Sequence, residues 1–193
     1  IAGVYPNDDA LCAVFEQVDQ ARQGTSLTYF EFGTLAALLM FKQAELDVVL
    51  LEVGLGGRLD AVNIIDADVA VISSVDLDHQ AWLGYDRDTI GREKAGILRS
   101  GKPAVCGDPQ PPRSVLDYSQ QQGALLHQID VHFGAEVQGQ SWRWFGLSAA
   151  GETLSMECLP NPGLAPENLA TALQALHLLN LPLSEQAVRE GLS

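Results

Sequence analysis

Three side chains in the first half of the chain could bind a metal ion or stabilise negative charge: Glu52, His79 and Lys94. Glu52 ends the apolar run Val48–Leu51, and His79 follows a second apolar run at Val69–Ser74. Because the carboxyl ends of parallel strands meet at one edge of a sheet, these side chains can converge there. One carboxylate, one imidazole and water suit Mg²⁺ bound to a nucleotide better than structural zinc. A purely structural histidine is an equally good interpretation of His79.

The glycine-rich segment after Glu52 fits neither common phosphate-binding motif. In Gly54–Leu59, leucine stands where G-x-G-x-x-G needs its last glycine, and no helical pattern follows. Gly96–Lys102 matches G-x-x-x-x-G-K, but Pro103 occupies the position of the Ser or Thr that binds Mg²⁺. This match also leaves a helix and enters a strand, whereas a phosphate-binding loop leads from a strand into a helix. We therefore treat the match as chance.

The apolar patterns predict alternating strands and helices. The run Val48–Leu51 is continuously apolar, as is typical of a strand buried on both faces of a parallel sheet. Repeated β-α-β order with short links predicts a mostly parallel, doubly wound α/β sheet. Residues 125–159 alternate between polar and apolar, which predicts a β-rich, antiparallel excursion. The other predicted elements are a helix capped by Asp8 or Asp9 and ending near Gly24, helices Thr28–Glu45, Thr89–Leu98, Ser114–Gly123 and Asn168–Leu179, a short helix from Ser184, and strands Val69–Ser74 and Lys102–Val105.

Composition indicates a globular protein that binds neither nucleic acid nor membrane. The 193 residues are 47% apolar and 19% charged, which is typical of a folded domain. The formal net charge of −14 argues against nucleic acid or an anionic membrane, because both need a basic face. No apolar run approaches the roughly 20 residues of a membrane span, and no signal peptide is visible. The cysteines at 12, 106 and 158 are far apart, which predicts reduced thiols in a cytoplasmic protein.

Four segments together carry a family resemblance: L-T-Y-F-E-F-G-T-L, L-L-E-V-G-L-G-G-R-L-D-A-V-N, L-D-H-Q-A-W-L-G and I-G-R-E-K-A-G-I-L. They occur in order over Leu27–Leu98 and resemble the folylpolyglutamate synthases of the Mur ligase superfamily, above all the bacterial bifunctional dihydrofolate synthase/folylpolyglutamate synthases. The resemblance implies a Mur ligase central domain-like fold. It also implies ATP-dependent ligation of L-glutamate to dihydropteroate or (tetrahydro)folate through an acyl phosphate, in folate biosynthesis, with Mg²⁺ as the metal.

The resemblance further implies roles for single residues. Glu52 and His79 match the Mg²⁺ ligands, Lys94 matches a lysine that is carbamylated in the family, and Asn168 matches an asparagine that contacts ATP. His79 and Lys94 are therefore the catalytic candidates. The residues that match the dihydropteroate site are Thr28, Tyr29, Phe30, Glu31, Leu59, Asp60 and Ala61. Among these, Phe30 is expected to stack on the pterin and Asp60 to form hydrogen bonds with it, while Thr28 and Glu31 also have the form of a capping box.

The resemblance implies that residues 1–193 are a partial central ATPase domain. The upstream phosphate-binding loop and a C-terminal glutamate-ligase domain are expected to lie outside this segment, which alone should be inactive. We expect the whole protein to be a monomer. Val62, Asp76, Gln80 and Ala81 depart from the family's usual residues, which bears on hydrogen bonding around the metal ligands and on substrate preference. Two other interpretations are another Mur-type amide ligase, which G-L-G-G-R-L-D-A argues against, and a non-catalytic remnant that binds a pterin or a protein partner.

Overall fold

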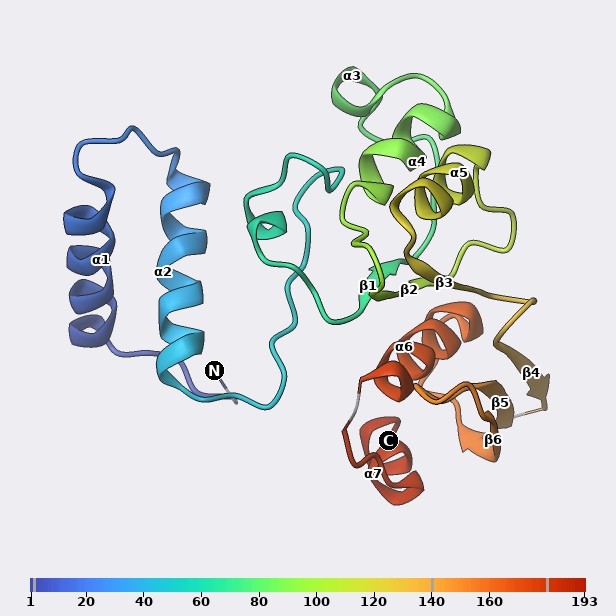
Figure 1. Ribbon diagram of the computed structural model, residues 1–193. Coiled ribbons are helices and arrows are strands. Elements are labelled where there is room, and N and C mark those ends of the chain that lie inside the picture. Colours follow the sequence, from blue (N-terminus) through green and yellow to red (C-terminus); the bar gives the residue numbers. More distant parts are fainter. Residues whose placement is uncertain (2, 140, 180) are drawn as a thin grey trace. The chain divides into compact units, whose positions relative to one another are not determined.

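The computed structural model describes residues 1–193 except residues 2, 140 and 180 (Figure 1). The chain forms two compact units. The N-terminal unit consists of Ile1–Leu55 and Asp60–Ile64, and the C-terminal unit consists of Gly56–Leu59 and Ile65–Ser193. None of the helices in the described ranges is long and apolar enough to cross a membrane.

The N-terminal unit is built mainly from two helices, α1 (Asp8–Arg22) and α2 (Tyr29–Gln43). Both were predicted from the sequence. Their apolar positions recur at helical spacing, so each helix turns one side toward the other. The small core between them is formed by Val14, Val18 and Ala36. A short 3₁₀ helix, η1 (Ala61–Ile64), completes this unit and lies against α2.

The N-termini of these helices confirm one predicted cap and correct another. Thr28 Oγ1 accepts a hydrogen bond from the Glu31 backbone N–H at 3.2 Å, and the Glu31 carboxylate accepts one from the Thr28 N–H at 2.7 Å, which is the expected capping box. The cap of α1 is Asn7, not Asp8 or Asp9, because both aspartates are already helical. Their negative charges still favour the positive end of the helix dipole.

The predicted strand over Val48–Leu51 is wrong. This segment has no regular secondary structure, and Val48 and Leu50 are 47% and 91% exposed. A β-strand requires a neighbouring strand that exchanges hydrogen bonds with it, and no strand in the described part of the chain pairs with this segment. The apolar run shows that these residues are hydrophobic, but it does not show whether a neighbouring strand is present to pair with them.

A three-stranded parallel sheet organises the C-terminal unit and confirms the predicted α/β architecture. Its strands are β1 (Ala70–Ile72), β2 (Pro103–Cys106) and β3 (Leu125–Gln128), in the order β1-β2-β3. The connection from β1 to β2 contains α3 (Gln80–Leu83) and α4 (Arg87–Ala95), and α5 (Arg113–Gln122) connects β2 to β3.

Helices cover both faces of this sheet, as a doubly wound arrangement requires (Figure 1). Ala104 and Cys106 of β2 share a buried cluster with Ile90 of α4 and Val115 of α5. Val105 points to the opposite face, where it joins the cluster formed with α6 (Pro166–Leu178). Successive side chains of β2 thus point into two different hydrophobic cores, which explains why the sequence of this strand is continuously apolar.

The predicted β-rich excursion is an antiparallel sheet of β4 (Gly134–Gln138), β5 (Ser141–Leu147) and β6 (Thr153–Pro160). It begins later than the expected residue 125, because Leu125–Gln128 pairs parallel with β2. Trp142 and Trp144 point from β5 into the core beneath α6 and are almost fully buried. Replacing either by alanine would cost about 3–5 kcal/mol. The short helix α7 (Glu185–Gly191) ends the chain.

Candidate functional site

His79 lies in the C-terminal unit, in the segment that leaves the carboxyl end of β1. It occupies the position before the first residue of α3 and has a left-handed backbone, with φ 50° and ψ 38°. Its imidazole is 58% exposed, and its Nε2 lies 3.6 Å from Oδ2 of Asp78. Left-handed geometry is uncommon for residues other than glycine and clusters at functional sites. The side chain is thus accessible, as a ligand for a substrate-bound metal must be.

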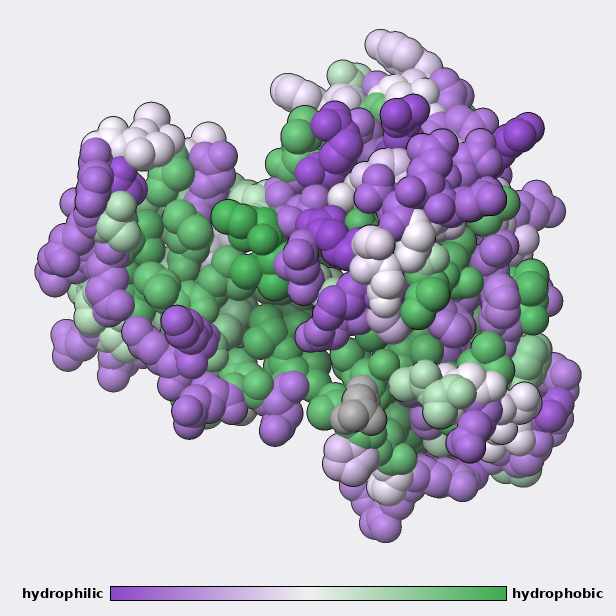
Figure 2. Space-filling view, viewed as in Figure 1, coloured by the Kyte–Doolittle hydropathy of each residue, from purple (hydrophilic) through white to green (hydrophobic). Residues whose placement is uncertain are grey.

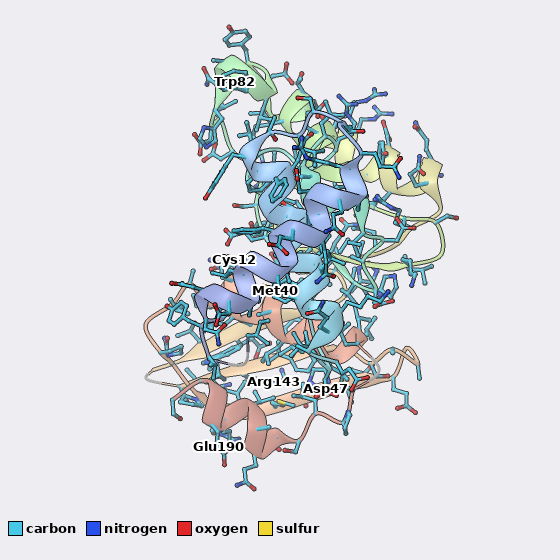
Figure 3. The ribbon with its side chains drawn as sticks, turned by 90° about the vertical axis from the view of Figure 1, so that its left-hand side faces the viewer. Cys12, Met40, Asp47, Trp82, Arg143 and Glu190 are labelled. Carbon is cyan, nitrogen blue, oxygen red and sulfur yellow. The ribbon has the colours of Figure 1, made fainter. Side chains whose placement is uncertain are left out.

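An exposed aromatic follows His79 on α3. Trp82 is 80% exposed and projects away from the helix (Figure 3). The backbone N–H groups of Trp82 and Leu83 donate to the His79 carbonyl at 2.8 and 3.1 Å. Helix α3 therefore fixes the C-terminal end of the segment Val75–His79.

Lys94 lies on α4 beside Gly57 and Arg58, which belong to the segment Gly54–Asp60, here called the glycine loop. Gly57 approaches the Glu93 and Lys94 carbonyls so closely that a Cβ at Gly57 would lie 3.1 and 3.2 Å from their oxygens. The Arg58 guanidinium clamps the Glu93 carboxylate, and the Arg58 N–H donates to the Glu93 carbonyl at 2.9 Å. The glycines therefore allow Gly56–Leu59 to pack on α4. The Lys94 side chain is partly exposed.

Glu52 lies in the N-terminal unit and its side chain is exposed. In the same unit, the Asp60 carboxylate accepts hydrogen bonds from the backbone N–H groups of Gly54, Leu55 and Val62 at 3.0, 3.3 and 3.0 Å. Asp60 was expected to bind a pterin. In the structure its carboxylate also holds the backbone of its own loop through these hydrogen bonds. Ala61 begins η1 directly after it.

The other pteroate candidates in the N-terminal unit surround the start of α2. Thr28 and Glu31 bind each other in the capping box, and these hydrogen bonds hold the pKa of Glu31 below its usual range. Tyr29 and Phe30 are 96% and 50% exposed, so the expected stacking surface is available. Hydrophobic side chains also reach the surface along α2 in Figure 2. Leu59, the remaining candidate, belongs to the C-terminal unit and is 79% exposed.

Asn168 lies in the first turn of α6, with its side chain exposed. Pro166 begins this helix and lacks an N–H group, as favoured at a first helical position. The structure therefore leaves Asn168 accessible at a helix N-terminus. Its expected contact with ATP stays a prediction.

The rejected phosphate-loop match has the reversed context that the sequence predicted. Gly96 is the C-cap of α4, and Pro103 is the first residue of β2. Lys102, the lysine of the match, forms an ion pair with Asp68 at 2.9 Å. A helix C-terminus carries partial negative charge and repels phosphate.

The donor chemistry of Glu52 and His79 fits a magnesium or manganese ion. Such an ion takes one or two protein ligands and completes its shell with water and substrate phosphates. In the described part of the chain, no three His, Cys, Asp or Glu side chains gather as a metal site. Glu52 and His79 belong to different units, so their joint action stays a prediction.

The sequence interpretation missed an ion pair between the buried Asp108 and the partly exposed Arg87. Asp108, which follows β2, is 5% exposed and accepts a hydrogen bond from Arg87 Nη2 at 2.8 Å. One signal could have found it: Asp108 stands just past an apolar strand, in the same context that drew attention to Glu52.

The comparisons with known proteins agree with the fold and with the motifs. The chain is 50% identical over 186 residues to the dihydrofolate synthase/folylpolyglutamate synthase of Escherichia coli strain K12, covering 96% of this chain and 43% of that protein. This chain is homologous to the bacterial dihydrofolate synthase/folylpolyglutamate synthases. No protein-family profile matches it.

Solved structures of such enzymes share the fold. E. coli FolC in complex with DHPP and ADP superposes with a TM-score of 0.91 at 51% identity, over 98% of this chain and 45% of that one. The Yersinia pestis bifunctional enzyme complexed with AMPPNP and Mn ion gives a TM-score of 0.89 at 52% identity, over 98% and 45%. The chain thus spans less than half the length of the relatives that it matches.

Proposed function

We propose that this chain is part of an ATP-dependent ligase that joins L-glutamate to dihydropteroate and to folates through an acyl phosphate, in folate biosynthesis. The observation that carries the proposal is the homology to the E. coli bifunctional enzyme, which extends over almost the whole chain at 50% identity. This likeness includes the segments of Glu52, His79 and Lys94, and it favours a folate ligase over other Mur-type amide ligases.

Two relatives support ATP as co-substrate and a divalent ion as cofactor. The E. coli structure holds ADP, and the Y. pestis structure holds AMPPNP and manganese. In this chain, the exposed Glu52 carboxylate and His79 imidazole would hold Mg²⁺, and Asn168 would contact the nucleotide. When bound, Mg²⁺ offsets negative charge on the phosphoryl oxygens. Carbamylation would convert Lys94 from a cation into an anion that helps to position metal.

The proposed pteroate site draws on both ends of the glycine loop and on the start of α2. The exposed Phe30 ring offers a stacking surface for a flat pterin, and Leu59 offers apolar surface. Asp60 keeps lone pairs beyond those that bind its own loop, since a carboxylate has about four acceptor positions. The DHPP complex of the E. coli relative supports a pterin ligand.

The proposal extends to the organisation of the whole protein. Residues 1–193 would be a partial central ATPase domain that is inactive alone, in a monomeric cytoplasmic enzyme that needs an upstream phosphate-binding loop and a C-terminal domain. The share of each relative that the chain matches, 43% of the E. coli protein, supports this view.

The decisive experiment measures ADP release by the full-length protein. With ATP and Mg²⁺, release should require both L-glutamate and dihydropteroate, and tetrahydrofolate should replace dihydropteroate. No release that depends on glutamate and a pteroate would refute the proposal. Activity on a peptidoglycan precursor instead would indicate another Mur-type ligase, and pterin binding without ADP release would indicate a non-catalytic remnant.

A further inference from the structure

Arg87 and Asp108 together bind both backbone polar groups of Val75. The Asp108 carboxylate accepts a hydrogen bond from the Val75 N–H at 2.9 Å, and Arg87 Nε donates to the Val75 carbonyl at 2.8 Å. Arg87 Nη2 closes the triangle by donating to Asp108 Oδ2 at 2.8 Å. All three residues lie in the C-terminal unit. The pair therefore fixes the backbone at the point where the chain leaves β1.

The same pair also orders the segment after β2. Arg87 Nη2 donates to the Gln110 carbonyl at 3.0 Å, and Asp108 Oδ1 accepts from the Gln110 N–H at 2.9 Å. Two segments that leave the carboxyl ends of neighbouring parallel strands are thus joined through one guanidinium and one carboxylate. The planar guanidinium can serve three acceptors at once because its donors form a rigid fork.

Stability alone is a poor explanation of this pair. The Asp108 side chain is 6% exposed and that of Arg87 is 40% exposed, so the cost of taking a carboxylate out of water falls on Asp108 and offsets much of what the ion pair returns. Apolar residues of similar volume often stabilise a fold equally well. The gain from a charged pair in this place lies in the geometry that it imposes on the backbone.

His79 is the residue that needs such geometry. Its left-handed backbone is a costly conformation, which persists only where the surrounding structure enforces it. The Arg87–Asp108 pair holds the segment at Val75, and α3 holds it through the His79 carbonyl. The backbone that leads to the histidine is therefore held by hydrogen bonds at both ends, at Val75 and at the His79 carbonyl.

We propose that Arg87 and Asp108 are positioning residues that aim the His79 imidazole at the metal. This inference rests on the proposed function, in which His79 binds the ion. Loosening the pair frees the Val75–His79 segment, so the imidazole samples orientations that do not bind metal. Metal affinity falls although no ligand has been removed.

The test uses full-length Asp108→Asn and Arg87→Lys proteins and titrates Mn²⁺ in the presence of AMPPNP, with free Mn²⁺ followed by electron paramagnetic resonance. Asp108→Asn should raise the Mn²⁺ dissociation constant about 10-fold. Arg87→Lys should raise it less, because lysine keeps the charge but loses the fork. Hydrogen exchange in the metal-free proteins should speed up at residues 75–79 while β2 and α4 stay protected.

Two further variants separate this inference from its premise. Arg143→Lys disturbs an arginine that pairs with Glu136 and Glu157 on the antiparallel sheet, and should leave Mn²⁺ binding unchanged. His79→Gln should lose Mn²⁺ affinity, and if it binds normally the metal role of His79 fails. If His79→Gln loses affinity while Asp108→Asn binds like the wild type, the positioning role alone is overturned. Faster exchange spread over β2 and α4 also overturns it, in favour of a purely structural pair.

Discussion

The carboxylate of Asp60 accepts a hydrogen bond from the backbone N–H of Gly54, which closes the glycine loop on itself at 3.0 Å. Asp60→Asn keeps the shape but replaces one oxygen with an NH₂ group, which cannot accept. We expect kcat/KM for dihydropteroate in the full-length protein to fall roughly 10- to 100-fold, since a hydrogen bond to a charged group contributes about 1.5–3 kcal/mol. Initial rates at varied pteroate concentration measure this.

The matched control for that change is Asp68→Asn. Asp68 is an exposed aspartate that forms a surface ion pair with Lys102, so its variant should keep the kcat/KM of the wild type. Equal losses in the two variants would mean that the Asp60 loop has no special part in pteroate binding.

Glu52→Gln tests the metal ligand of the N-terminal unit. A neutral amide binds Mg²⁺ more weakly than a carboxylate, so kcat at saturating Mg²⁺ should fall at least about 10-fold and the half-saturating Mg²⁺ concentration should rise. Steady-state rates over a Mg²⁺ series provide the measurement. Glu16→Gln, which changes an exposed carboxylate on α1, is the control. Wild-type kinetics in Glu52→Gln would remove Glu52 from the metal site.

Lys94→Arg tests carbamylation. Arginine keeps the positive charge but its guanidinium does not form the carbamate, so ligation should be lost while the fold is retained. Wild-type protein equilibrated with ¹³C-labelled CO₂ should show a carbamate carbon signal by NMR, and Lys94→Arg should lack it. Lys42→Arg on α2 is the control and should keep both signal and activity. A carbamate signal that survives in Lys94→Arg would assign the modification to another lysine.

The sequence predicted the parallel sheet well because each face of β2 meets a different core, and a continuous apolar run is the direct consequence. It failed at Val48–Leu51, since Val48, Val49 and Leu50 are exposed and no strand among the described residues pairs with this run. Hydrophobicity is a property of the residues, whereas a strand is a property of the residues and their neighbours.

The candidate site was predictable to a similar extent. Motif matching named His79, but its left-handed backbone and the pair that holds Val75 depend on contacts between segments far apart in the chain. Arg87 and Asp108 belong to no motif found in the sequence. The place of Asp108 just past an apolar strand is a partial signal, but the hydrogen bonds that join Arg87 and Asp108 to Val75 are visible only in the structure.

His177 of α6 should make stability depend on pH. Its ring stacks on Trp144 of β5, with centroids 4.6 Å apart and planes 15° apart, and its buried Nε2 has no hydrogen-bond partner in the described part of the chain. Burial lowers the pKa of His177 below the ordinary value of about 6.5. The unfolded chain therefore binds a proton first as the pH falls, and the folded state loses stability.

The contribution of His177 to the free energy of unfolding should consequently be constant above about pH 7.5 and decrease from about pH 6.5 downward, by at most about 1.4 kcal/mol per pH unit. His127, whose pKa is also lowered by burial and then by nearby His132, adds to the same slope. His177→Phe keeps the stacked ring and removes the titration, so its urea unfolding should show a shallower acid decrease than the wild type. His127→Phe should remove the remainder, and an unchanged slope in the double variant would assign the acid sensitivity to other groups.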